Sequence, residues 1–519
     1  MIKLSKRRAL VPLTLAGAIV CAVIFAGSGG AATPSAGVNC AADGKVDARG
    51  ATFQTKAQLG FAVGFTNDVC GIVGPDLARD GVTSTSTFSN PAMVLYNQYN
   101  SPSGQPNTES GSGFGQKAMS CRTDAFGGSD IPYDNATLAL LDGAPGSIKI
   151  NGLTNNCSNQ VNAGGGNAGG GFGPDYAPSY APNGGTYPNA ADVAGQMLSF
   201  PVAGASEAVF ANLNGVCTTP PTTLTLTGSQ ISLLFGGEIT NWNDSRLVGA
   251  GTGLGTSSCT GPVTRVVRLD KSGTTQIFKN YLKNVDGSRT GAGCSTGTTW
   301  TSLALDANNV TWPSSGTCST LQRGDINGNP GVLHEVFGSA SVTAISGAIG
   351  YADVADFKGY TPVPSTLRVS LANVRNATDT SFQPSTSGNV SNCSFSTMST
   401  PSGTGGPVGQ NFDPNNPTAT TNDTWSLDNP GTIRADVTQK GAKYPICGVT
   451  FAMVYPLQTT PNAVSQLNAD QRRTVYSYFT YILSSTGQSV LGGTGNGRFY
   501  SPLATSVVDQ LRTAFQSAY

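Results

Sequence analysis

The sequence feature that most constrains the fold is a strand–turn–helix pattern around residue 270. The run Val263–Val267 predicts a strand, and Gln276–Leu282 has the apolar spacing of a helix. Between them lies Arg268–Thr275, whose Ser, Gly and Thr residues are typical of a helix start. The first N–H groups of a helix lack internal partners and carry partial positive charge, so the segment predicts an anion site. The alternative is an ordinary helix cap beside a surface arginine.

Other short apolar runs alternate between strand-like and helix-like spacing along the chain. This alternation predicts an α/β fold with mixed, mainly parallel sheets flanked by helices. The expected elements are paired strands at 197–202 and 207–213, a strand followed by a helix at 224–234, strands at 347–351 and 449–454, and helices at 469–486 and 504–518.

Three segments lack sustained apolar periodicity and are rich in Gly, Ser, Thr, Asn or Pro. They span residues 142–190, 285–330 and 370–440. Such composition does not support a packed core by itself, so we expect long loop insertions there.

The first 32 residues have the composition of a signal peptide. Four basic side chains precede the apolar run Ala9–Phe25, and small residues follow at 29–32. The sequence therefore predicts an exported protein that is periplasmic, associated with the cell envelope, or secreted. A retained membrane anchor is the alternative, because the apolar run is near the lower length limit for a membrane span.

Charge and cysteine usage narrow the functional classes. Residues 1–32 carry four of the 29 basic and none of the 29 acidic side chains, so the remaining chain has a net charge of −4 and offers no nucleic-acid surface. That remainder contains ten of the 11 cysteines, an even number that predicts disulfides, with Cys294 and Cys318 a plausible pair. No Cys-x-x-Cys spacing occurs and only one histidine is present, so a zinc site is disfavoured.

Eight segments, in order, resemble those of one family. The chain is similar to the phosphate-binding proteins of ABC phosphate importers (PstS-type), which have a two-lobed periplasmic-binding-protein fold of type 2. The segments that carry the resemblance are Gly50–Phe53, Gly111–Gly115, Phe126–Pro132, Leu234–Asp244, Arg268–Thr275, Gly347–Tyr351, Tyr444–Ile446 and Tyr500–Leu503.

The resemblance implies a site for inorganic phosphate between two lobes. Lobe I would comprise residues 33–202 and 448–519, lobe II residues 203–447, with crossing strands near 200–202 and 446–450. It implies no enzyme activity, no cofactor and no metal, an ABC permease as partner, and a monomer. The implied phosphate ligands are Thr52, Phe53, Ser112 and Asp130 from lobe I, and Arg268, Ser272, Gly273 and Thr274 from lobe II.

Several features depart from the family pattern, and two of them lie in the expected anion loops. Gln54 replaces a frequent proline, and Gly113-Phe114 replaces a pair of small residues. The second departure leaves Ser103 as an alternative to Ser112 for the donor of the second loop.

An aspartate in an anion site has a chemical reason. Phosphate at neutral pH still carries a proton that it can donate to a carboxylate, whereas sulfate does not. Asp130 would therefore select phosphate by penalising sulfate. We expect Arg268 to pair with Asp130 as well as with the ligand, which would keep the carboxylate ionised.

Two other function classes are compatible with parts of the sequence. A surface or adhesion protein could use the same fold with an altered anion site, since the insertions are long. A phosphatase or other hydrolase is less favoured, because His334 stands without the second histidine of a zinc helix and Ser112 lacks a recognisable catalytic base nearby in sequence.

Overall fold

The structure is a computed structural model. It describes residues 46–70, 94–97, 111–121, 124–130, 149–150, 153–154, 198–304, 309–375, 381–382, 444–454, 469–492 and 499–518. The expected signal peptide, most of the insertions at 142–190 and 370–440, and Ser103 lie outside these residues. Of the helices in the described ranges, none combines the length and apolarity that a bilayer crossing needs.

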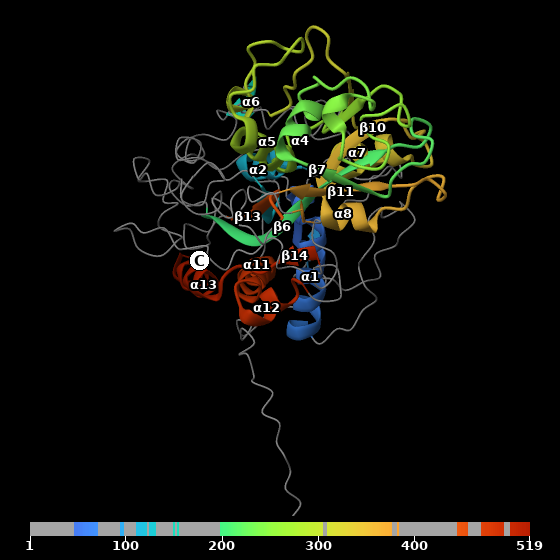
Figure 1. Ribbon diagram of the computed structural model, residues 1–519. Coiled ribbons are helices and arrows are strands. Elements are labelled where there is room, and N and C mark those ends of the chain that lie inside the picture. Colours follow the sequence, from blue (N-terminus) through green and yellow to red (C-terminus); the bar gives the residue numbers. More distant parts are fainter. Residues whose placement is uncertain are drawn as a thin grey trace, which may run out of the picture.

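Two long antiparallel strands connect the halves of the molecule. Strand β6 (Leu198–Asn212) pairs with β13 (Cys447–Val454) from Leu198 to Ser206, and then with β10 (Ala348–Asp353) from Glu207 to Asn212. The expectation of two paired strands at 197–202 and 207–213 is wrong, because the intervening residues continue as one 15-residue strand. Figure 1 shows β6 and β13 between the two groups of helices.

The first half is built on parallel strands and on helices from both ends of the chain. Strand β1 (Val46–Gly50) pairs in parallel with β2 (Val94–Tyr96) and β3 (Phe126–Ser129), and β3 pairs antiparallel with β13. Aromatic side chains fill the core, with Phe126 and Phe479 at 4.9 Å between ring centroids. The helices are α1 (Thr55–Cys70), α2 (Ser112–Cys121), α11 (Ala469–Ile482), α12 (Ser485–Ser489) and α13 (Thr505–Ala518).

The second half surrounds β10. Strand β10 pairs in parallel with β8 (Thr264–Val267), and β8 pairs in parallel with β9 (Thr320–Arg323). The ring of Tyr351 stacks on Phe278 at 4.5 Å between centroids, which joins the sheet to helix α5 (Gly273–Asp286). The other helices here are α4 (Gly228–Phe235), α6 (Trp300–Ala304), α7 (Asn329–Phe337), α8 (Val354–Gly359) and the short 3-10 helix η5 (Ser245–Leu247).

The remaining short strands complete the sheet at its sides. Strand β11 (Ser370–Arg375) pairs with β6, β7 (Thr223–Leu226) and β12 (Ser381–Phe382), and β14 (Tyr500–Ser501) pairs with β6. A separate hairpin joins β4 (Lys149–Ile150) to β5 (Leu153–Thr154). The α/β fold with a mixed sheet and flanking helices, expected from the sequence, is confirmed.

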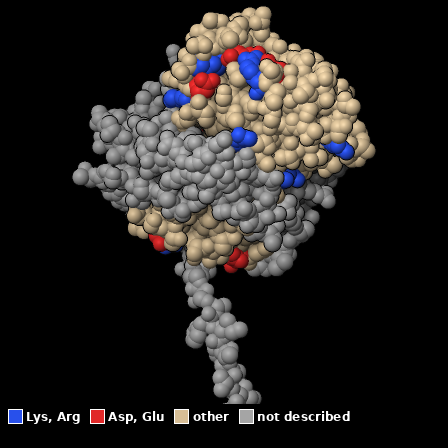
Figure 2. Space-filling model, in the orientation of Figure 1, with Lys and Arg blue, Asp and Glu red and all other residues tan. Residues whose placement is uncertain are grey.

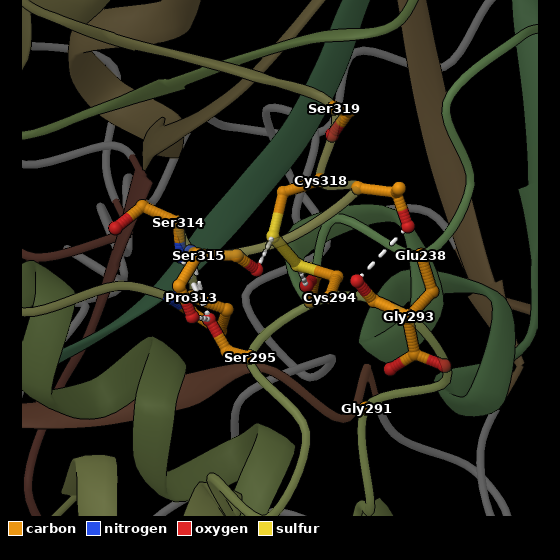
Figure 3. The surroundings of a disulfide bond; sticks show 12 residues. Glu238, Gly291, Gly293, Cys294, Ser295, Pro313, Ser314, Ser315, Cys318 and Ser319 are labelled. Atoms are coloured by element: carbon orange, nitrogen blue, oxygen red, sulfur yellow. Dashed lines mark hydrogen bonds between the residues drawn. A yellow bond between two sulfur atoms is a disulfide. The ribbon is translucent and has the colours of Figure 1, made fainter.

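The segment 285–330 is not simply a loop, which corrects the sequence-based expectation. It contains α6 and β9, and the expected disulfide between Cys294 and Cys318 is present (Figure 3). The guanidinium of Arg265 donates to the backbone carbonyls of Phe235, Pro313 and Ser319. Buried donors and a covalent link thus replace the apolar periodicity that the segment lacks. A second disulfide joins Cys217 and Cys259.

Gly50 at the end of β1 permits a close approach to β3. Its φ is +149°, and an added Cβ would lie 2.0 Å from the carbonyl oxygen of Gly128. Gly249 also has positive φ, +84°, but its Cβ position has no atom within 4 Å. Comparing the two glycines therefore distinguishes the cost of a positive φ, which both share, from the cost of steric overlap, which only Gly50 has.

We expect Gly50→Ala to lower the free energy of unfolding by about 1–3 kcal/mol more than Gly249→Ala, because only Gly50 faces a neighbouring strand. Urea denaturation followed by circular dichroism measures both variants. Equal losses of stability would contradict the close packing of β1 against β3.

Candidate functional site

Residues at the ends of parallel strands meet at one edge of the sheet. Strands β1 and β3 run in parallel and end at Gly50 and Ser129, so the residues that follow them, Thr52 and Asp130, lie at the same edge. Strand β8 ends at Val267 and leads directly to Arg268 and to helix α5. This arrangement brings three of the segments singled out in the sequence into contact.

The hydroxyl group of Ser112 joins the two halves of the site. Ser112 begins helix α2 and is fully buried. Its Oγ accepts hydrogen bonds from the backbone N–H of Asp130 and of Gly273, both at 3.0 Å, and donates to Oδ2 of Asp130 at 3.3 Å. Gly273 is the first residue of α5, so Ser112 already binds one of the free N–H groups of this helix. Figure 1 shows α2 beside α5.

Gly273 lies too close to Asp130 for a side chain. An added Cβ would lie 2.2 Å from Cβ of Asp130 and 2.4 Å from Oγ of Ser112. The glycine is therefore required for the close approach of the helix start to the carboxyl group.

Arg268 is buried, and all three nitrogens of its guanidinium group donate hydrogen bonds. Its Nε and Nη2 donate to Oδ1 and Oδ2 of Asp270 at 2.8 and 2.6 Å, which is a forked ion pair. Its Nη1 donates to Oδ1 of Asn329 at 2.8 Å, to Oγ1 of Thr52 at 3.2 Å and to Oγ1 of Thr274 at 3.3 Å. Burial alone would lower the pKa of Arg268, but the carboxylate of Asp270 offsets this and the pKa is raised overall.

The expected ion pair between Arg268 and Asp130 is wrong. Asp270, two residues after Arg268, provides both carboxylate oxygens to the guanidinium. A near neighbour in the sequence satisfies the fork with little ordering of the chain, so Asp130 receives only the more distant effect of the Arg268 charge.

Asp130 is held by hydroxyl donors instead. The hydroxyl of Thr450 in β13 donates to its Oδ1 at 2.5 Å, and the amide of Gln54 donates to the same hydroxyl at 2.8 Å. Burial raises the pKa of Asp130 to about 7, while the hydrogen bond from Thr450, the charge of Arg268 and the hydrogen bond from Ser112 act in the opposite direction. The carboxyl group therefore changes its charge close to neutral pH.

Three further predicted residues lie in the helix cap and the first loop. Ser272 caps α5, with its Oγ accepting from the N–H of Thr275 at 3.2 Å. Thr52 and Phe53 form the 3-10 helix η2 (Thr52–Gln54) after β1. The ring of Phe53 is buried in the core, so only its backbone is available to the site, and its carbonyl oxygen accepts from the hydroxyl of Tyr500.

The structure adds site residues that the sequence reasoning missed. Asn329, at the start of α7, donates to Asp353 at 2.5 Å and to Asp356 at 2.9 Å while accepting from Arg268. Asp270 lies inside the segment 268–275, and its spacing from Arg268 was the signal that could have revealed it. Thr450 and Asn329 carry no local signal, because only the tertiary pairing brings them to Asp130 and Arg268.

The described residues contain no group of three or more His, Cys, Asp or Glu side chains placed to hold a metal ion. What they do contain is a set of hydroxyl, amide and backbone N–H groups around one buried guanidinium and one buried carboxyl group. Such a set can bind a small oxyanion that both accepts and donates hydrogen bonds.

Comparison with known families places the chain. Residues 190–485 match the family described as a PBP superfamily domain, which is more than half of the chain. The chain belongs to the PBP superfamily. The matched residues include β6, β8, α5, β10 and β13.

Similar proteins add a narrower comparison to this PBP-superfamily assignment. Phosphate-binding proteins PstS from two strains of Xylella fastidiosa, Temecula1 and 9a5c, are each 31% identical over 137 residues, or 26% of this chain and 30% of the relative. The match thus spans less than a third of these relatives. A human phosphate-binding apolipoprotein is 16% identical with a TM-score of 0.50, covering 90% of this chain and 94% of that one. The ancestral soluble variant of the human phosphate-binding protein has the same identity and TM-score, covering 90% and 93%. At this identity the structures show a shared fold.

We expect Thr450→Val to lower the free energy of unfolding by about 1–3 kcal/mol at pH 8, because it removes the shorter of the two hydroxyl hydrogen bonds to an ionised buried carboxylate. The loss should be smaller at pH 5, where Asp130 is protonated. Denaturant unfolding at the two pH values measures this. The matched control is Thr480→Val, since the buried Thr480 hydroxyl has no hydrogen-bond partner within the described residues; similar losses in both variants would contradict the role of Thr450.

The raised pKa of Asp130 predicts a pH dependence of stability. The folded protein holds this proton up to about pH 7, whereas an unfolded chain releases it near pH 4, so the contribution to stability falls as pH rises between these values. Without added anion, Asp130→Asn should therefore gain stability relative to the parent chain, on the order of 4 kcal/mol, between about pH 4 and pH 8.

A series of unfolding measurements across that pH range checks the sign. Asp244→Asn is the control, because the hydrogen bond from Arg246 lowers the pKa of this partly exposed aspartate. Its small difference should have the opposite sign. If the difference in stability between Asp130→Asn and the parent chain does not change with pH, the raised pKa of the Asp130 carboxyl group is contradicted.

Proposed function

We propose that this chain binds inorganic phosphate between the residues that follow β1 and β3 and those that follow β8, and delivers it to an ABC importer. The observation that carries the proposal is the contact of Asp130 and Ser112 with the start of α5 beside Arg268. The names of the Xylella fastidiosa relatives support phosphate as the ligand. The ligand groups would be Thr52, Phe53, Ser112, Asp130, Arg268, Ser272, Gly273 and Thr274.

The charge balance of the site favours recognition by hydrogen bonds. The charge of Arg268 is matched by Asp270, so the pair brings no net positive charge to an anion. Attraction must then come from N–H and hydroxyl donors and from the start of α5. An ionised Asp130 accepts the proton that phosphate carries and meets only acceptors on sulfate, which gives selectivity through a penalty.

The contacts between the halves suggest how binding couples to closure. Besides the bond from Gly273 to Ser112, the N–H of Gly113 donates to the carbonyl of Lys271 at 3.2 Å, and Arg268 donates to Thr52. A ligand that bridges the same groups favours the closed arrangement by its additional contacts. In this proposal lobe I comprises residues 33–202 and 448–519, lobe II residues 203–447, and an ABC permease recognises the closed monomer.

The proposal includes export. Residues 1–32 would act as the signal peptide, and the remaining chain would work in the periplasm, at the cell envelope or as a secreted protein. The chain would act as a binding protein and carry out no catalysis.

We expect isothermal titration at pH 8 to show phosphate binding with at least ~10⁴-fold preference over sulfate, because a site built for a ligand proton rejects an analogue without one. Asp130→Asn should reduce this preference to within about tenfold, since an amide can donate to sulfate. The parent chain itself should accept sulfate better as pH falls through about 7, where Asp130 gains a proton that it can donate.

Two variants delimit the result. Arg268→Ala should abolish binding of both anions, and Asp244→Asn, on the surface beside Arg246, should change neither. A folded chain that ignores phosphate would contradict the proposed function. If Asp130→Asn binds phosphate with an unchanged preference over sulfate, this contradicts the selectivity role of the carboxyl group but not phosphate binding itself.

A further inference from the structure

A second acidic side chain is buried at the junction of the two halves. Glu207 lies in β6 at the point where this strand stops pairing with β13 and begins pairing with β10. Its exposed fraction is 0%, and neither carboxylate oxygen has a hydrogen-bond partner among the described residues. Nothing in the site described above uses this group.

The strand register places Glu207 on the same face as the site. In β13, Gly448 pairs with Ala205 and Thr450 with Ala203, so side chains at 203, 205 and 207 share the face from which Thr450 reaches Asp130. On its other side Glu207 pairs directly with Asp353 of β10, whose carboxylate accepts from Asn329. The side chain therefore lies between the groups that hold Asp130 and those that hold Arg268.

Helix α5 covers this face with its first turns. An added Cβ on Gly448 would lie 2.2 Å from the end of Ile277, and the hydroxyl of Tyr351 lies 2.6 Å from that of Thr275. Gly448 and Tyr351 flank Glu207 on the two neighbouring strands. Glu207 is thus beneath the helix start whose N–H groups form the proposed anion site.

The charged groups around Glu207 do not offset the cost of burying a negative charge on its carboxyl group. Burial raises the pKa of Glu207 well above its ordinary value and the charge of Asp130 raises it further, while Arg268 acts in the opposite direction. Arg268 is already paired with Asp270. The titratable and charged groups that face Glu207 are Asp130 after β3, Arg268 after β8, Tyr351 and Asp353 in β10, and Tyr444 before β13.

We propose that Glu207 is a proton-binding group of the anion site, which holds a proton when the oxyanion is bound and so couples affinity for the anion to pH. This inference rests on the proposed phosphate site. No bond is made or broken beyond this O–H bond, and the proton comes from the solvent. A bound anion beside Asp130 and Arg268 makes a negative charge on Glu207 still more costly, so ligand and proton favour each other's binding.

The sign of the effect follows from linkage. An acid that binds its proton more tightly with ligand than without takes up protons on ligation. Affinity is then complete below the pKa of Glu207 in the unliganded protein and decreases as pH rises above it. Each unit of difference between the two pKa values corresponds to about a tenfold change in affinity.

Isothermal titration with phosphate from about pH 6 to pH 9.5, in buffers of different ionisation enthalpy, tests the proposal. Glu207→Gln mimics the protonated acid. Over this pH range, we expect its affinity for phosphate to fall by a factor at least about tenfold smaller than that for the parent chain. Glu207→Met, which removes the proton site with a similar chain length, should behave alike and serves if the amide disturbs folding. The parent chain should also take up more protons per phosphate bound than either variant, because only the parent chain has this additional carboxyl group that gains a proton on ligation.

The control is Glu335→Gln near the end of α7. The groups that act on this glutamate are Gln322, Asp325 and His334 rather than residues of the site, so the variant should retain the parent profile. Superimposable pH profiles and equal proton uptake in the parent chain and a folded Glu207 variant would overturn the proposal. If neither variant folds, the proton uptake of the parent chain alone still tests the proposal. An uptake that phosphate and one carboxyl group fully explain would overturn it. Absence of phosphate binding at every pH would instead contradict the proposed function on which it rests.

Discussion

The pairing of β6 with β13 is the constraint on which the rest of the structure depends. Strand β6 is long enough to belong to both halves of the sheet, and the register of β13 against it determines which side chains face α5. A shift of β13 by one residue would turn Thr450 away from Asp130 and place it on the face opposite to Glu207. The position of the polar groups in the site is therefore a property of a backbone hydrogen-bond ladder rather than of the loops alone.

The local features of the site could be predicted from sequence. A helix start with Ser272 as its cap follows from the turn residues between a strand-like and a helix-like run, and the structure has this cap. The juxtaposition of residues 52, 112, 130 and 268 came from the resemblance to a family rather than from periodicity. The contact between Asp130 and Thr450 could not be predicted, because Thr450 is 320 residues away in the sequence.

Two of the expectations for secondary structure were wrong for physical reasons. The small residues at 203–206, which include Gly204 and Ser206, separated the two strand-like runs and favoured two short strands. Pairing with β13, β14 and β10 nevertheless holds residues 198–212 as one strand. In the segment 285–330 a covalent link and arginine–carbonyl contacts supply the order that apolar periodicity normally supplies. Tertiary interactions outweighed local composition in both cases.

The distribution of arginines has a consequence for how the molecule responds to its solvent. Arg49, Arg265, Arg268 and Arg289 are buried, and charged residues make up only 11% of the sequence. Among the described residues on the face in Figure 2, charged side chains are few and gather near the top of the view. Dissolved ions screen exposed charges far more than buried ones. The interactions of these four arginines should therefore be nearly the same in dilute and in saline media.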